Sequence, residues 1–85
     1  MEITEIKIFP VFGNKRIKAL VEIIFDNKLE VTELRIINGK NRLFVEWPIS
    51  QHSGARNSRA LVRPINKEYG DFTEKRILDE YHNSF

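Results

Sequence analysis

A ten-residue segment, 17–26, alternates apolar and mixed side chains and is the strongest constraint on how this chain folds. Its apolar parity holds Ile17, Ala19, Val21, Ile23 and Phe25. The other parity holds all three charged residues of the segment. Because side chains of a strand point alternately to opposite faces, this pattern predicts a strand with one wholly apolar face. Such a face needs a second layer to cover it.

Two other segments alternate in the same way. Segment 3–9 places Ile6 and Ile8 opposite Lys7 and ends at Pro10, which cannot donate a ladder hydrogen bond. A later segment stops at Pro48, and its inward residues are Leu43, Val45 and Trp47. The shared parity of Trp47 with its neighbours favours a place in the core over an exposed stacking surface.

The segment between these strands changes parity. Leu29 and Val31 lie on one parity, whereas Leu34 and Ile36 lie on the other. An apolar face that changes parity needs one extra residue in the strand, so we predict a β-bulge near 32–33.

Turn-forming residues separate the four predicted strands. They are Gly13 and Asn14, Asp26 and Asn27, and Asn38 and Gly39. These residue types accept the backbone conformations of tight hairpins, so the strands should form an antiparallel meander. Residues 60–62 would add a short fifth strand that ends at Pro64.

The C-terminal part is typical of a helix. Asp71 with Glu74 three residues later resembles a capping box, which predicts a helix start at Asp71. Phe72 would lie opposite the apolar stripe and be exposed. The stripe itself consists of Ile77, Leu78, Tyr81 and Phe85. The predicted class is therefore α+β: an antiparallel β-meander of four to five strands with one C-terminal α-helix packed on it.

Size and composition narrow the class further. A chain of 85 residues fits one domain, 1–85, with a modest core, and a second copy could supply missing burial. The absence of cysteine excludes disulfides and thiolate chemistry. The N-terminus lacks the pattern of a secretory signal, and no apolar run is long enough for a membrane span. The absence of cysteine also fits a reducing compartment.

Positive charge is concentrated in one window. Residues 40–63 hold five cations against one acid, Glu46, whereas the whole chain has a formal charge of only +2. The cations are Lys40, Arg42, Arg56, Arg59 and Arg63. Guanidinium groups bind phosphate in two-pronged geometry, so this polar window is a candidate nucleic-acid site. Gln51 and Asn57 could contact base edges, and Phe44 or Trp47 could stack on bases if exposed.

Nothing in the chain marks an active site or a cofactor. Ser50 and His52 are close in sequence, but no third group orients them. Asp79 and His82 could share a helix face, but a structural zinc site needs four ligands. The glycines are too widely spaced for a phosphate loop. We therefore expect no enzyme activity, cofactor, metal or small-molecule substrate.

Several segments together resemble the family of stage V sporulation protein G, the septation protein family. The similarity begins in residues 1–6 and covers 26–48. Its most specific parts are 34–39, 43–45 with Pro48, and 64–66. It continues at 64–66 and 80–82. The resemblance implies a small cytoplasmic bacterial protein with a sheet and a C-terminal helix, and a homodimer. It also implies roles in division-septum control, the cell cycle and sporulation, DNA or RNA binding, and no enzyme activity.

The chain departs from the family pattern at its basic residues. Where members usually carry Lys-Arg after the proline that matches Pro48, this chain has Ile49 and Ser50. Arg63 stands where histidine is common, and Gly70 where arginine is common. The window is one residue longer, and its cations have moved to Arg56 and Arg59. The alternation and turns that carry the fold similarity are kept.

Two functions follow from these observations. The first is a regulatory protein that binds DNA or RNA through the basic window. The alternative is a protein-interaction module in cell-division regulation, whose basic window contacts an acidic partner.

Overall fold

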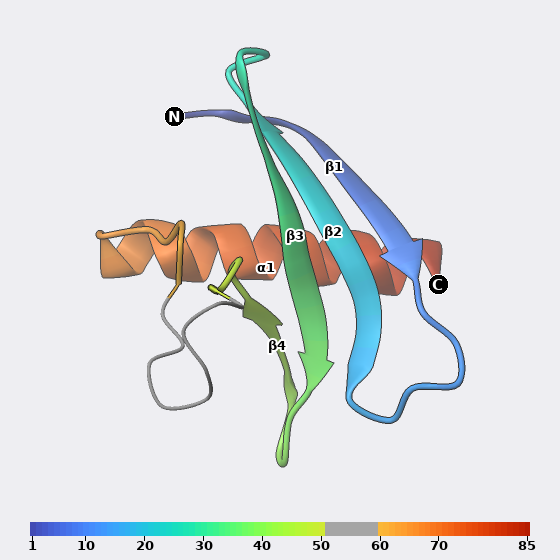
Figure 1. Ribbon diagram of the computed structural model, residues 1–85. Helices are drawn as coiled ribbons and strands as arrows, with labels where there is room; N and C mark the ends of the chain where they lie inside the picture. Colours follow the sequence, from blue (N-terminus) through green and yellow to red (C-terminus); the bar gives the residue numbers. More distant parts are fainter. Residues whose placement is uncertain (51–59) are drawn as a thin grey trace.

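Four strands and one helix make up the part of the chain that the computed structural model describes, residues 1–50 and 60–85 (Figure 1). The elements are β1 (Ile3–Pro10), β2 (Ile17–Phe25), β3 (Leu29–Asn38), β4 (Leu43–Glu46) and α1 (Lys67–Ser84). The strands form one antiparallel sheet in the order β1-β2-β3-β4, and α1 crosses one face of it. The α+β class and the meander are confirmed.

The core lies between α1 and the apolar parity of β2. Ala19, Val21 and Ile23 are fully buried, as is Ile77 of the helix. Burial of a large aliphatic side chain contributes about 1.5–3 kcal/mol, so this layer accounts for much of the fold's stability. The opposite face of the sheet carries no helix (Figure 1), and we call it the open face.

The predicted bulge in β3 is confirmed. Val21 pairs with Leu34 and Ile23 with Val31, so two residues of β3 stand opposite one residue of β2. Glu33, the second of these two β3 residues, has a φ of 64°. The bulge keeps both Val31 and Leu34 on the core face.

Two predicted hairpins differ in their turns. Asp26 and Asn27 both have a φ of 54°, and the Lys28 amide donates to the Phe25 carbonyl at 2.9 Å, as in a type I′ turn. After β3 the loop is longer, and the Gly39 amide donates to the Arg42 carbonyl at 3.0 Å. A Cβ on Gly39 would lie 2.7 Å from that carbonyl oxygen, which explains the glycine.

The predicted start of the helix is wrong. The N-cap is Asn66, whose side chain accepts a hydrogen bond from the Tyr69 amide at 2.8 Å. Asp71 lies inside the helix and pairs with Lys67 at 2.8 Å. Both Asn and Asp are good caps, and the choice between them depends on tertiary packing. Gly70 permits that packing, because a Cβ there would lie 3.0 Å from Pro64 Cγ.

The prediction that the apolar stripe of the helix packs on the sheet is confirmed in the middle of the stripe and wrong at its C-terminal end. Ile77 is buried and Leu78 and Tyr81 pack against the core, but Phe85 is 60% exposed because it lies at the C-cap. Phe72 is exposed, as predicted. The sequence pattern did not predict that Thr73 is buried. Its hydroxyl donates to the Tyr69 carbonyl, so the buried polar group has a hydrogen-bond partner within the helix.

The predicted fifth strand is reduced to a bridge. Ala60 forms a single antiparallel bridge with Ile49, and the Leu61 amide donates to the Pro48 carbonyl at 2.7 Å. Leu61 and Val62 are exposed and do not continue a ladder within the described residues. A strand as short as 60–62 is not stable when it pairs with a neighbouring segment at only one position.

Candidate nucleic-acid interface

The five predicted site residues lie in three parts of the chain. Arg56 and Arg59 fall in 51–59, outside the described residues, as do Gln51, His52 and Asn57. The remaining predicted site residues are Lys40 and Arg42, in the β3–β4 loop, and Arg63, in the segment before α1.

Lys40 and Arg63 have the properties that a phosphate contact needs. Both are exposed, and no described carboxylate lies within 4 Å of either charged group. Arg63 also lines two apolar hollows, one beside Tyr69 and Trp47 and one beside Ile65. Its charge therefore stands within an otherwise apolar part of the surface.

Arg42 has a structural role that its position in the sequence did not indicate. Its Nη1 donates to Glu74 Oε1 at 2.8 Å and to the Leu43 carbonyl at 2.9 Å. The other carboxylate oxygen, Glu74 Oε2, accepts from the Val45 amide at 3.2 Å. Arg42 and Glu74 thus join α1 to β4, and the charge of Arg42 is already compensated.

The two aromatic candidates for base stacking differ in position. Trp47 packs against the core, as its parity predicted. Phe44 lies on the open face, pairs with the buried Ile37 and is half-buried itself. A third aromatic residue on the open face is Phe9, which is 48% exposed near the end of the edge strand β1.

A second basic cluster was missed. The β1–β2 and β3–β4 loops lie at one end of the sheet (Figure 1), and the Asn38 amide donates to the Arg16 carbonyl at 2.7 Å. We call the cations in and beside these loops the basic end: Lys15, Arg16, Lys18, Arg35, Lys40 and Arg42. Only Glu46 and Glu74 pair with them among the described residues. The run of three cations within 15–18 is the sequence signal for this cluster.

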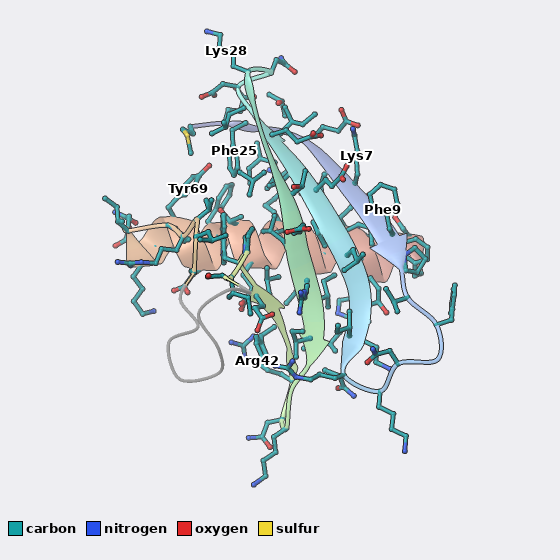
Figure 2. The ribbon with its side chains drawn as sticks, in the orientation of Figure 1. Lys7, Phe9, Phe25, Lys28, Arg42 and Tyr69 are labelled. Carbon is teal, nitrogen blue, oxygen red and sulfur yellow. The ribbon has the colours of Figure 1, made fainter. Side chains whose placement is uncertain are left out.

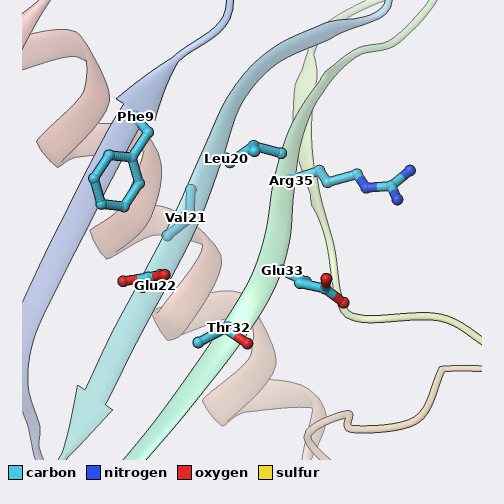
Figure 3. Close-up of a pocket in the computed structure, with 7 residues that line it drawn as sticks. All are labelled: Phe9, Leu20, Val21, Glu22, Thr32, Glu33 and Arg35. Atoms are coloured by element: carbon cyan, nitrogen blue, oxygen red, sulfur yellow. The ribbon is translucent and has the colours of Figure 1, made fainter.

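The open face holds a shallow hollow of about 400 Å³ (Figure 3). Phe9 and Leu20 provide its apolar part, and Arg35 lies at its edge toward the basic end. Two acids, Glu22 and Glu33, also line it. The mixed charge does not favour a polyanion in the hollow itself, so we place the candidate interface at the cations beside it.

An apolar surface extends around Arg63. Leu61 is 68% and Ile65 is 90% exposed, and both line hollows shared with Leu29 or Met1. We call this the apolar surface: Met1, Leu29, Leu61, Val62 and Ile65. The nearby outer edge of β3 is unpaired before Arg35 within the described residues. Exposed apolar patches beside an open strand edge are typical of protein interfaces.

The charged groups of α1 have ordinary surface roles. Asp79 pairs with Lys75 at 2.9 Å, and His82 contacts the Tyr81 ring. The hydrogen bond from Lys67 to Asp71 raises the pKa of the Lys67 ammonium. In residues 1–50 and 60–85 no three potential metal ligands come together, and no helix could cross a membrane.

Comparison with known proteins covers almost the whole chain. The SpoVG family model matches residues 1–83. A septation protein SpoVG of Clostridium novyi is 35% identical over 81 residues, 95% of this chain and 80% of that protein. The SpoVG protein of Clostridioides difficile is 33% identical over 84 residues, covering 99% of this chain and 90% of its own. That of Caldicellulosiruptor saccharolyticus is 32% identical over 81 residues, covering 95% and 91%. The chain belongs to the SpoVG family.

Proposed function

We propose that this protein is a cytoplasmic, non-enzymatic regulator of septation and sporulation that binds DNA or RNA through Lys40, Arg63 and the arginines at 56 and 59. The observation that carries the proposal is that Lys40 and Arg63 are exposed without a carboxylate within 4 Å among the described residues. Membership of the SpoVG family, whose relatives are named septation proteins, supports the biological role.

The physical basis is counterion release. Each phosphate that a free cation neutralises releases condensed ions, so affinity falls steeply with salt. A cation that is already paired, such as Arg42 with Glu74, has to give up its partner first and contributes less. We therefore assign Arg42 a positioning role beside the interface.

The test is a pair of double variants. Lys40→Ala with Arg63→Ala should weaken binding of an oligonucleotide at least about fivefold and reduce the salt slope by up to about two, because two phosphate contacts are lost. Fluorescence anisotropy over a series of salt concentrations measures both effects.

The control removes the same charge outside the proposed site. Lys7 and Lys28 are not part of that site and lie toward the end opposite Arg42 (Figure 2), so Lys7→Ala with Lys28→Ala should change binding less than twofold. Equal losses in the two variants would show that net charge alone acts. Absence of binding by the unmodified protein to random-pool DNA and RNA would refute the nucleic-acid function.

A second candidate function has its own observation. The apolar surface and the unpaired edge of β3 favour contact with protein. We propose that this surface forms a homodimer, in which two copies of the basic residues act together on one nucleic acid. In the alternative function the basic window contacts an acidic partner in cell-division regulation, and nucleic acid has no direct role. A partner that is recovered after nuclease treatment would favour that alternative.

A further inference from the structure

Glu46 lies between two arginines of the basic end. Arg35 pairs with it across the β3–β4 ladder, and Arg16 reaches it from the neighbouring loop. The Arg35 Nη1 to Glu46 Oε1 distance is 3.7 Å, and the Arg16 Nη2 to Glu46 Oε2 distance is 3.8 Å. Each carboxylate oxygen therefore faces a different guanidinium.

Neither contact is a hydrogen bond. Charge-assisted N–H···O bonds are about 2.7–2.9 Å long, so both arginines are held by charge alone. Glu46 Oε1 is buried and has no hydrogen-bond partner among the described residues. A buried carboxylate oxygen in this state is incompletely stabilised. One carboxylate also leaves one of the two positive charges uncompensated.

A phosphate group would satisfy both arginines better than Glu46 does. It carries more charge and more acceptor oxygens, and it is not tied to the backbone of β4, so it can form two-pronged bonds. The Arg16 side chain is 63% exposed, which gives a phosphate access to its guanidinium from solvent. Lys15 and Lys18, next to Arg16 in the sequence, raise the local positive potential.

We propose that Arg16 and Arg35 form a phosphate-binding site and that Glu46 acts as its built-in competitor. This inference rests on the proposed function for the source of the phosphate, a nucleic-acid backbone, but adds residues outside the 40–63 cation set. Glu46 thereby limits affinity at the basic end. Removing its charge strengthens binding, which is the opposite of what a purely structural acid would do.

The variant Glu46→Gln tests the competitor role. It should raise oligonucleotide affinity about fivefold, because one repulsive charge at contact distance is removed. The matched control is Glu30→Gln, which removes an acid paired with Lys7 at 3.5 Å on the same sheet and changes the net charge equally. Equal gains in Glu46→Gln and Glu30→Gln, or no gain in Glu46→Gln, would overturn the proposal.

A coupled variant locates the effect. In an Arg16→Ala background the gain in affinity from Glu46→Gln should fall to less than twofold, because the Arg16 guanidinium that the substitution would release is no longer present. A gain of the same size with and without Arg16 would also overturn the proposal. Thermal melts check that each variant is folded.

A second arm uses inorganic pyrophosphate and does not depend on nucleic acid. NMR titration should shift the Arg16 and Arg35 Nε–H signals, with tighter binding in Glu46→Gln. Absence of these shifts would refute the site. Shifts with pyrophosphate but no oligonucleotide binding by any variant would retain the phosphate site and refute the proposed function.

Discussion

Glu33 adopts a backbone conformation that its side chain does not favour. Its φ of 64° lies in the left-handed region, where Cβ crowds the following carbonyl. The residue persists there because the bulge keeps Val31 and Leu34 together in the core. The cost of the conformation is about 1–2 kcal/mol, which the burial of those two side chains exceeds.

Substitution at Glu33 should reveal this cost. Glu33→Asn should leave stability equal or raise it by up to about 1 kcal/mol, since asparagine tolerates the left-handed region. Glu33→Val should lower it by about 1–2 kcal/mol, because a β-branched residue does not. Urea denaturation measures both. Thr32→Val is the control, since Thr32 has no positive φ and is already β-branched, and an equal loss there would contradict the explanation.

Tyr69 makes stability depend on pH at the alkaline end. Burial raises the pKa of its phenol, the Asp26 carboxylate adds to the rise, and the hydroxyl donates to the Met1 carbonyl at 2.8 Å. The folded state thus holds the proton more tightly than the unfolded state, whose pKa is about 10. The stabilisation is complete below that value and is lost as pH rises through the folded pKa.

The comparison with Tyr69→Phe separates the titration of this phenol from that of the lysines, which also titrate at alkaline pH. Between about pH 9 and about pH 12 the unmodified protein should lose stability relative to the variant, measured by urea denaturation at each pH. A difference that stays constant over this range would mean that the phenol does not titrate differently in the two states.

At the scale of elements, the helix start depends on Asn66. Its side chain caps the Tyr69 amide, so Asn66→Ala should cost about 1 kcal/mol, whereas Asn66→Asp should cost little. Asp71→Ala removes only an exposed pair with Lys67 and should change stability by less than about 0.5 kcal/mol. Circular dichroism melts distinguish the two. A larger loss from Asp71→Ala would place the functional cap one turn later.

The elements that the sequence predicted correctly share one property: the residues that specify each of them lie close together in the sequence. Alternation in 17–26 and the parity change at the bulge are visible in the residues themselves, and so is the Asp26 and Asn27 turn. The helix start was missed because two suitable caps lie near each other and Pro64 packing on Gly70 accompanies the earlier one. The fifth strand was predicted but forms only a single bridge, because alternation does not say whether a partner edge exists.

The candidate site was predictable only in part, for the same reason. Exposure of Lys40 follows from its polar, turn-rich surroundings, whereas Arg63 is exposed although its sequence neighbours are apolar. The pairing of Arg42 with Glu74 spans 32 positions, and that of Arg16 with Glu46 joins the β1–β2 loop to β4. The pattern of apolar and polar residues does not predict such long-range contacts. Only the tertiary structure therefore shows which cations are free and which are paired with a carboxylate.

At the scale of the whole molecule, the basic end and the apolar surface are different regions, and Arg63 is a cation that lines hollows of the apolar surface. The basic end gathers cations from two loops, whereas the apolar surface lies where Leu29, Leu61 and Ile65 are exposed. An 85-residue domain buries a limited share of its surface, so covering this region with a second copy would add stability. Arg63 lines a hollow of this surface, so its guanidinium stays available to phosphate only if it lies at the rim of the contact between copies.

This arrangement predicts that the homodimer depends on the apolar surface. Leu61→Ser with Ile65→Ser should shift the protein from dimer to monomer in sedimentation equilibrium, because two exposed apolar anchors are lost. Phe12→Ser is the control, since Phe12 is 86% exposed on the β1–β2 loop, away from this surface. If the double variant stays dimeric, the copies meet elsewhere. If it becomes monomeric, oligonucleotide affinity should also fall, because the second basic region is no longer held near the nucleic acid at a high effective concentration.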